Sequence, residues 1–190
     1  QAPLAYQVID GEKVEVPCKF KLKDNVLTYR FPKGYDETVE LVIDPVLIFS
    51  SFTGSSADNF GFTATYDNLE NTYAGGIVFN NGTYPTTPGA YQTAFAGPVT
   101  GITDIGISKF NADGTGLLYS TYLGGETGSE APHSLVVNNS NELFIFGTSA
   151  SNDFPTTTGA YQTTFIGGPT VTPQNSGMNY VNGADIIVSR

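Results

Sequence analysis

The stretch Phe154-Pro-Thr-Thr-Thr-Gly-Ala-Tyr-Gln-Thr-Thr-Phe165 has a second copy in this chain. Seventy residues earlier the sequence reads Tyr84-Pro-Thr-Thr-Pro-Gly-Ala-Tyr-Gln-Thr-Ala-Phe95, which is identical at nine of twelve positions. Two copies of so irregular a string indicate an internal repeat, and a repeat decides how the rest of the chain is interpreted. The segments around the two copies can therefore be aligned with each other.

Strand-like segments flank both copies in the same order. Ahead of each copy, residues 46–54 match residues 117–124 at an offset of 70. Both segments carry large side chains on the two faces of a strand, which suits a sheet that is covered on both sides. After each copy, residues 104–109 match residues 185–190.

A hairpin lies between the flanking strand and the repeated string. It runs over residues 62–76 in the first copy and 134–147 in the second. Asp67 and Asn138 fall at equivalent places, and either side chain can accept backbone N–H bonds two residues on and so begin an Asx turn. Each repeat unit is therefore about four strands long.

Four-stranded units in tandem predict an all-β fold made of β-propeller blades, which need roughly four to eight units to close a ring. The composition agrees, because 22 Gly and 11 Pro with 14% charged residues suit short strands and tight turns. Residues 1–44 carry no copy of the repeat, and we expect three or four short antiparallel strands there. We expect residues 45–116 and 117–190 to be two repeats. The second repeat stops in mid-unit, so we expect an incomplete propeller, a fragment of a larger protein.

Charge and cysteine content exclude several classes of function. The net charge of −10 and the absence of a basic cluster argue against nucleic acid as a partner. No apolar run has the length of a membrane span. Cys18 is the single cysteine, so an internal disulfide is excluded, and we expect a buried, unreactive thiol.

Three motifs together resemble the SBBP, or seven-bladed β-propeller, repeat family over residues 45–190. They are Leu-Tyr-Ser-Thr-Tyr-Leu-Gly-Gly at 118–125, Gly-Thr at 147–148, and Asp-Phe-Pro-Thr-Thr-Thr-Gly-Ala-Tyr-Gln at 153–162. The resemblance implies a large extracellular or cell-surface bacterial protein, frequent in Bacteroidota, and in many cases exported by type IX secretion. In such proteins a β-rich domain often precedes the repeats, and residues 1–44 resemble the end of that domain. The family offers no catalytic residues to transfer to this chain.

Residues with chemical potential have simpler structural interpretations. His133 is the one histidine, and we expect an ordinary residue at a strand edge. Glu126 and Glu130 could be imagined as a glycosidase pair, but such pairs depend on a separation in space that sequence does not give. Asn111 and Asp113 offer oxygens at alternate positions, like part of a calcium loop; a glycine-containing hairpin turn is the favoured interpretation, with calcium as the alternative.

Aromatic residues of the repeated string are the candidate binding residues: Tyr84, Tyr91, Tyr161 and Phe165. We expect Tyr91, Phe95, Tyr161 and Phe165 to anchor the two loops to the sheets, with a sugar-stacking platform of the loop tyrosines as the alternative. The predicted function is a non-enzymatic scaffold that acts in adhesion or protein interaction, its partner being the rest of its own chain or another protein. A glycan-binding module is the second hypothesis, and a hydrolase with a carboxylate pair in a central channel is the third.

Overall fold

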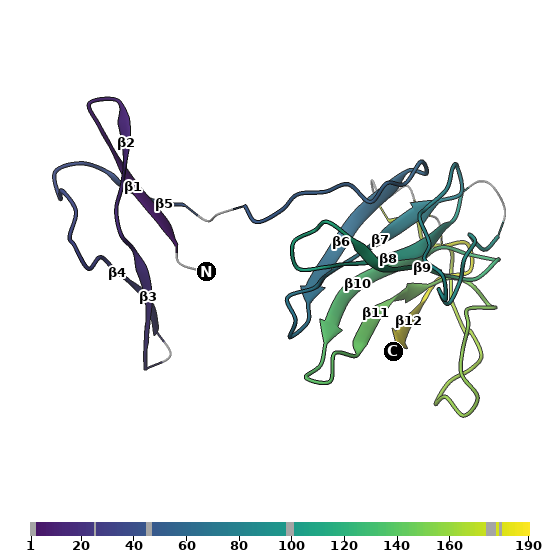
Figure 1. Cartoon of the computed structure of the whole chain (residues 1–190). Coiled ribbons are helices and arrows are strands. Elements are labelled where there is room, and N and C mark those ends of the chain that lie inside the picture. Colours follow the sequence, from purple (N-terminus) through teal and green to yellow (C-terminus); the bar gives the residue numbers. More distant parts are fainter. Residues whose placement is uncertain (1–2, 25, 45–46, 98–100, 174–177, 179) are drawn as a thin grey trace. The chain divides into compact units, whose positions relative to one another are not determined.

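The computed structural model describes residues 3–24, 26–44, 47–97, 101–173, 178 and 180–190. Over these residues the fold is all-β, as predicted, with twelve strands joined by turns and loops (Figure 1). No described part of the chain forms a helix that could cross a membrane. The chain divides into an amino-terminal unit, Gln1–Ile48, and a carboxy-terminal unit, Phe49–Arg190.

The amino-terminal unit contains five short strands rather than the three or four expected. They form a sheet of order β2-β1-β5 and a separate β3-β4 hairpin, with bounds β1 Leu4–Ile9, β2 Glu12–Glu15, β3 Lys19–Lys23, β4 Val26–Arg30 and β5 Leu41–Asp44. A small core of Ala5, Val16 and Cys18 holds the unit together, so the predicted burial of the cysteine is confirmed.

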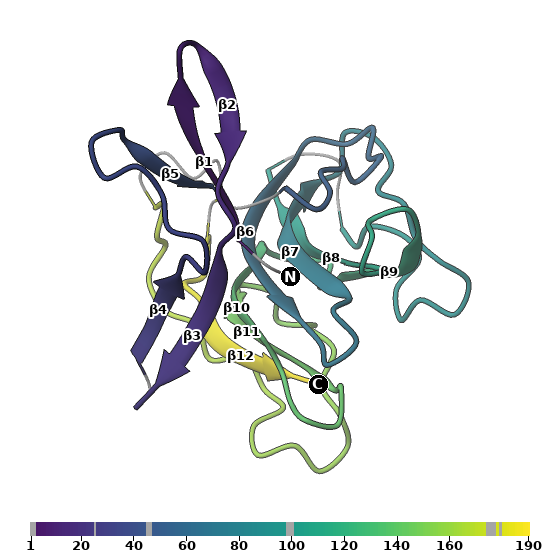
Figure 2. The same ribbon diagram turned by 60° about the vertical axis from the view of Figure 1, so that its left-hand side comes forward.

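The carboxy-terminal unit contains two antiparallel sheets (Figure 2). Sheet I has the order β6-β7-β8-β9, with bounds β6 Asn59–Tyr66, β7 Thr72–Phe79, β8 Thr103–Phe110 and β9 Leu117–Leu123. Sheet II has the order β10-β11-β12, with bounds β10 Glu130–Val137, β11 Leu143–Ser149 and β12 Asp185–Ser189. Strands β6, β7 and β8 are the repeat equivalents of β10, β11 and β12.

The two sheets bury a common core. Sheet I contributes Tyr73, Ile105, Ile107 and Leu123, and sheet II contributes Leu135, Ile145 and Ile187. Close approach depends on one glycine of β7, because a Cβ at Gly75 would lie 2.9 Å from a methyl group of Leu135. One face of sheet I therefore packs on one face of sheet II, and each sheet keeps a second face that the other does not cover.

Sheets and sequence repeats are out of phase by one strand. The sequence repeat begins at residue 117, yet β9 pairs with β8 and completes sheet I before the chain enters sheet II. Residues 47–54, the repeat equivalents of β9, form no strand, and their neighbour Val46 lies outside the described residues. Sheet II, in the described part of the chain, has three strands where sheet I has four.

Candidate functional site: a loop that holds the outer strand of a sheet

The repeated string forms a loop that binds the outer strand of sheet I. We call residues 84–96 the first clasp loop. Its Thr87 N–H donates to the Ser120 carbonyl at 3.1 Å, and the Thr87 hydroxyl accepts from the Ser120 N–H at 3.0 Å. Two residues along β9, the Tyr122 N–H donates to the Gln92 carbonyl at 3.1 Å. The loop thereby satisfies backbone groups on the side of β9 that faces away from β8, and this edge of the sheet is protected.

Side chains lock the first clasp loop in place. The Tyr84 hydroxyl lies 2.6 Å from the Ser108 hydroxyl, and the Tyr84 N–H donates to the Tyr122 hydroxyl at 2.9 Å. Phe95 packs edge-on against the Tyr122 ring. Gln92 donates to Asp104 Oδ2 at 2.8 Å and accepts from the Gly124 N–H at 3.0 Å, so it joins the start of β8 to the end of β9.

The predicted aromatic anchors divide into two groups. Phe95 packs against the Tyr122 ring and Phe165 is half-buried, in agreement with an anchoring role, and the candidate binding residue Tyr84 is buried. Tyr91 and Tyr161 are wrong as anchors, because their side chains are 66% and 104% exposed. The polar residues Thr87 and Gln92, which make the actual contacts to the strand, were missed by sequence reasoning, although they belong to the repeated string.

The second clasp loop, residues 154–166, has the same local geometry as the first. The N–H of Ala160 donates to the Thr157 carbonyl at 3.0 Å, as Ala90 does to Thr87, and Gly159 has the same φ of 82° as Gly89. A positive φ is what glycine supplies at this turn. Asp185 accepts the Ile166 N–H at 2.8 Å, as Asp104 accepts the Ala96 N–H at 2.9 Å.

The second clasp loop differs from the first in what it holds. Thr157 and Gln162 are exposed, and among the described residues neither is bonded to a strand; Gln162 donates only to the Thr164 carbonyl beside it. Strand β12 is the edge of sheet II. The second clasp loop and the edge strand β12 are thus the repeat equivalents of the first clasp loop and β8, and in sheet I strand β9 lies between these two.

A pair of buried carboxylates lies under the glycines that end β9. Asp104 and Glu130 are both fully buried, and an oxygen of each lies against Gly124. Burial raises the pKa of each carboxyl to about 7, against the hydrogen bonds from Gln92 and Ala96 to Asp104 and from Ser149 to Glu130. Asp104 Oδ1 has no hydrogen-bond partner in the described structure. Since neither group reaches solvent, the pair offers no route for a substrate.

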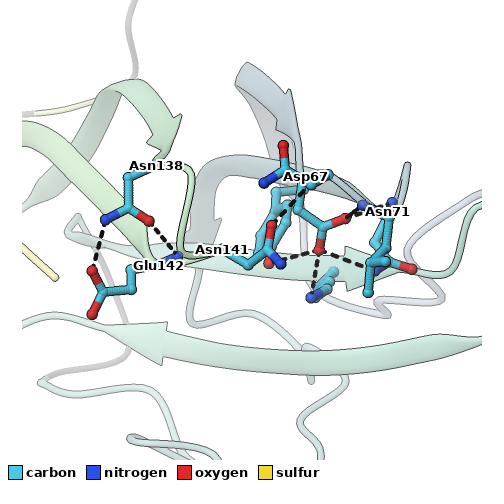
Figure 3. A network of polar contacts seen from close by, with 9 residues as sticks. Asp67, Asn71, Asn138, Asn141 and Glu142 are labelled. Carbon is cyan, nitrogen blue, oxygen red and sulfur yellow. Dashed lines mark hydrogen bonds and ion pairs between the residues drawn. The ribbon is translucent and has the colours of Figure 1, made fainter.

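A second polar network stabilises the hairpin turns of both sheets (Figure 3). Asp67 forms the predicted Asx turn by accepting the Leu69 and Asn71 N–H groups, and it pairs with Lys109 at 2.8 Å. Burial alone would raise the pKa of Asp67, but the bonds from Lys109 and Asn71 outweigh burial and hold it well below its usual range. Asn138 forms the equivalent Asx turn in sheet II.

The turns of the two sheets also touch each other. The N–H of Asn68 donates to the Asn141 side chain at 3.1 Å, and the Asn68 side chain donates to the Asn139 carbonyl at 3.1 Å. Glu70 and Asn141, which are equivalent by the repeat, both adopt a positive φ, of 62° and 60°. Equivalent turns of neighbouring sheets therefore recognise one another directly.

The remaining candidate residues have structural roles. His133 is exposed on β10 and its Nε2 lies 2.8 Å from the Thr148 hydroxyl. Asn111 and Asp113 use their oxygens within their own hairpin turn, on the Gly116 N–H and on Thr115. Glu126 is exposed and Glu130 is buried, so the two carboxyl groups have different surroundings. The described residues contain no group of three His, Cys, Asp or Glu side chains arranged to hold a metal ion.

Comparison with known proteins places only the amino-terminal unit. Residues 1–46 match DUF7948, a domain of unknown function. No curated protein and no solved structure matches the chain.

Proposed function

We propose that the chain is a non-enzymatic scaffold of propeller-type repeats that acts at the bacterial cell surface or outside the cell by binding other protein segments. The observation that carries the proposal is the second clasp loop beside the open edge of β12. Its equivalent in sheet I already holds an extended strand through Thr87 and Gln92. An exposed strand edge binds extended segments by main-chain hydrogen bonds, with side-chain pockets giving the selectivity.

The resemblance of residues 45–190 to propeller repeats supports the same proposal. A four-stranded and a three-stranded sheet, packed face to face, form the framework that carries the two clasp loops. Loops held on a rigid framework are the usual place for recognition. The extracellular location follows from the family resemblance and remains part of the proposal.

A labelled peptide with the sequence of residues 117–125 tests this function. We expect saturable binding to the intact chain in a fluorescence anisotropy titration, and weaker binding after Gln162→Ala. Tyr161→Ala is the matched control, because this neighbour in the same loop is exposed, as its equivalent Tyr91 is in the loop that holds β9. Binding of a scrambled peptide with equal strength, or no saturable binding, would contradict the proposal.

A glycan-binding module is the second candidate function. Tyr91 and Tyr161 occupy equivalent places in the two clasp loops, and both rings are open to solvent. Exposed aromatic rings with a polar end stack well against sugar rings. A glycan array probed with the chain tests this candidate, and it requires hits that disappear in the double variant Tyr91→Ala, Tyr161→Ala.

A further inference from the structure

The chain itself contains an unpaired segment of the kind that the β12 edge would bind. By the repeat, residues 47–54 are equivalent to residues 117–124, with Leu, Ser and Gly identical at the first, fourth and last positions. Tyr122 of β9 is 4% exposed, whereas Phe52 at the equivalent place is 96% exposed. No backbone group of residues 47–54 forms a bond to another described strand or loop; Ser51 bonds only the adjacent carbonyl. The segment has the sequence of an outer strand without the contacts of one.

We propose that residues 47–54 of one copy of this chain add to the β12 edge of a second copy, beneath its second clasp loop. This inference rests on the proposed function and names the partner. In sheet I the register pairs Ser108 with Ser120 and Gly106 with Tyr122. Applied to the second clasp, the same register places Ser189 opposite Ser50 and Ile187 opposite Phe52.

The exposed faces of the two sheets support the same contact between copies, which we call the proposed joint. We call the packing of sheet I on sheet II within one chain the internal joint. The outer face of sheet II carries Phe146, Ile186 and Val188, the last two of which are 84% and 64% exposed. Their equivalents in sheet I are Gly75, Ile105 and Ile107, which are buried against sheet II. The outer face of sheet II is thus the same kind of surface as the face that sheet I uses in the internal joint.

Side-chain sizes match across the proposed joint. In the internal joint the small Gly75 faces the large Leu135. At the equivalent places in the proposed joint, Phe146 of one copy would face Ala64 of the other. The free face of sheet I, on which Ala64 lies, is hollowed beside a row of paired glycines, Gly61, Gly76 and Gly106. Large residues on one side and a hollow on the other are what close packing requires.

The polar contacts of the internal joint also have counterparts. Thr63 accepts the Leu135 N–H at 3.2 Å in the internal joint, and Ser134 has a hydroxyl at the equivalent place, exposed on β10. Asn139, the equivalent of Asn68, is exposed in the turn of sheet II. A second copy would present Glu70 to it, in the same left-handed backbone conformation as Asn141.

A joint of this kind is heterologous, because each copy uses one surface to donate and another to accept. Such contacts form rings when the rotation closes and filaments when it does not. The net charge of −10 opposes association, so added salt should strengthen it.

Two complementary variants test the proposal by sedimentation velocity over micromolar to millimolar concentrations. Phe52→Asp destroys the donor segment and Ile186→Asp destroys the acceptor face; both side chains are exposed in the single copy, so folding is preserved. We expect the unsubstituted chain to associate and each variant to associate about 100-fold more weakly, since a buried unpaired charge is costly. Tyr91→Asp, which is exposed on the first clasp loop, should associate like the unsubstituted chain.

Mixing the two variants gives the sharpest result. The Phe52→Asp copy keeps a good acceptor and the Ile186→Asp copy keeps a good donor, so the mixture should form a dimer and nothing larger. In a Cys18→Ser background, Ser50→Cys and Ser189→Cys in separate copies should form a disulfide on oxidation, and Ser51→Cys with Ser189→Cys should not. Directly opposite residues of a non-hydrogen-bonded pair lie about 4.5 Å apart, which a disulfide can span.

The outcomes separate this inference from the proposed function. A chain that stays monomeric, or oligomers that both aspartate variants leave unchanged, would overturn the second copy as partner. If the peptide of residues 117–125 still binds in that case, the β12 edge accepts a strand from elsewhere in a larger protein, and the proposed function stands. If neither the peptide nor a second copy binds, both fail.

Discussion

Replacing the buried Asp104 by asparagine should change how the stability of the carboxy-terminal unit depends on pH. The carboxyl group is fully buried, and burial raises its pKa to about 7, well above the value of 3.8 that it has in an unfolded chain. Between these two pH values the folded chain binds the proton more tightly than the unfolded chain does. Folding is therefore favoured at low pH, and this contribution is lost as the pH rises toward 7.

The magnitude follows from the two pKa values. Each unit of difference corresponds to about 1.4 kcal/mol, so ionising Asp104 should lower the free energy of unfolding by about 2 to 3 kcal/mol between pH 5 and pH 8. Glu130, with a pKa of about 7 against 4.5, adds a loss of similar size. Asp67 acts in the opposite direction, because its lowered pKa stabilises the fold above pH 4, but that contribution is constant from pH 5 upward.

Urea unfolding at pH 5, 6, 7 and 8, followed by near-ultraviolet circular dichroism of the tyrosines, measures the effect. At each pH the free energy of unfolding of Asp104→Asn is compared with that of the unsubstituted chain, so that the effect of the remaining charges, which both chains share, is removed. We expect this difference to shift by about 2 to 3 kcal/mol in favour of the variant from pH 5 to pH 8. Asp113→Asn is the matched control, since this carboxyl is exposed in a turn. A difference independent of pH would refute the reasoning that burial controls this carboxyl.

Three further perturbations have defined outcomes. Gly124→Ala should destabilise the fold by about 2 to 4 kcal/mol in urea unfolding, because the new methyl group would collide with Asp104 and lie 2.8 Å from a Glu130 oxygen. A loss under about 1 kcal/mol would show that the carboxylates can move aside. Tyr122→Phe should cost about 1 to 3 kcal/mol, since it leaves the buried Tyr84 N–H without its acceptor, and a neutral result would mean that water replaces the hydroxyl. Calcium or EDTA should leave the melting temperature unchanged, because Asp113 already accepts bonds from its own turn; a calcium-dependent rise would restore the calcium-loop interpretation.

Most strands of the carboxy-terminal unit could be predicted because their signals are local, but the strand expected over residues 46–54 was wrong, since residues 47–54 form no strand. The hairpins, the Asx turns at Asp67 and Asn138, and the match of residues 104–109 with 185–190 all follow from short stretches of sequence, and all are present in the structure. The amino-terminal unit has more strands than the three or four expected, and its β1 carries the buried Gln7, which bonds to the backbone of Asp36 and Val39.

Contacts between distant residues could not be predicted in the same way. Asp104 and Glu130 meet only because β10 packs against sheet I, whereas the two carboxylates that are neighbours in the sequence, Glu126 and Glu130, differ in burial. The ion pairs of the two turns illustrate the same limit. Asp67 pairs with Lys109 in sheet I, whereas in sheet II Arg190 pairs with Glu142, which is equivalent to Asn71 and not to Asp67.

The repeats and the sheets are out of phase by one strand. This explains why the repeated string resembles an ordinary surface loop in the sequence but binds the outer strand of a sheet in the structure. In the sequence, each string follows a hairpin and its role is hidden, because the strand that it holds, β9, lies some thirty residues further on and begins the next repeat. Sheet I takes its last strand, β9, from the repeat that follows. Where the two repeats join, the first clasp loop covers the outer edge of this strand, which would otherwise be exposed to other chains. The second loop retains Thr157 and Gln162 where the first uses Thr87 and Gln92, which is the reason to look for the strand that it holds.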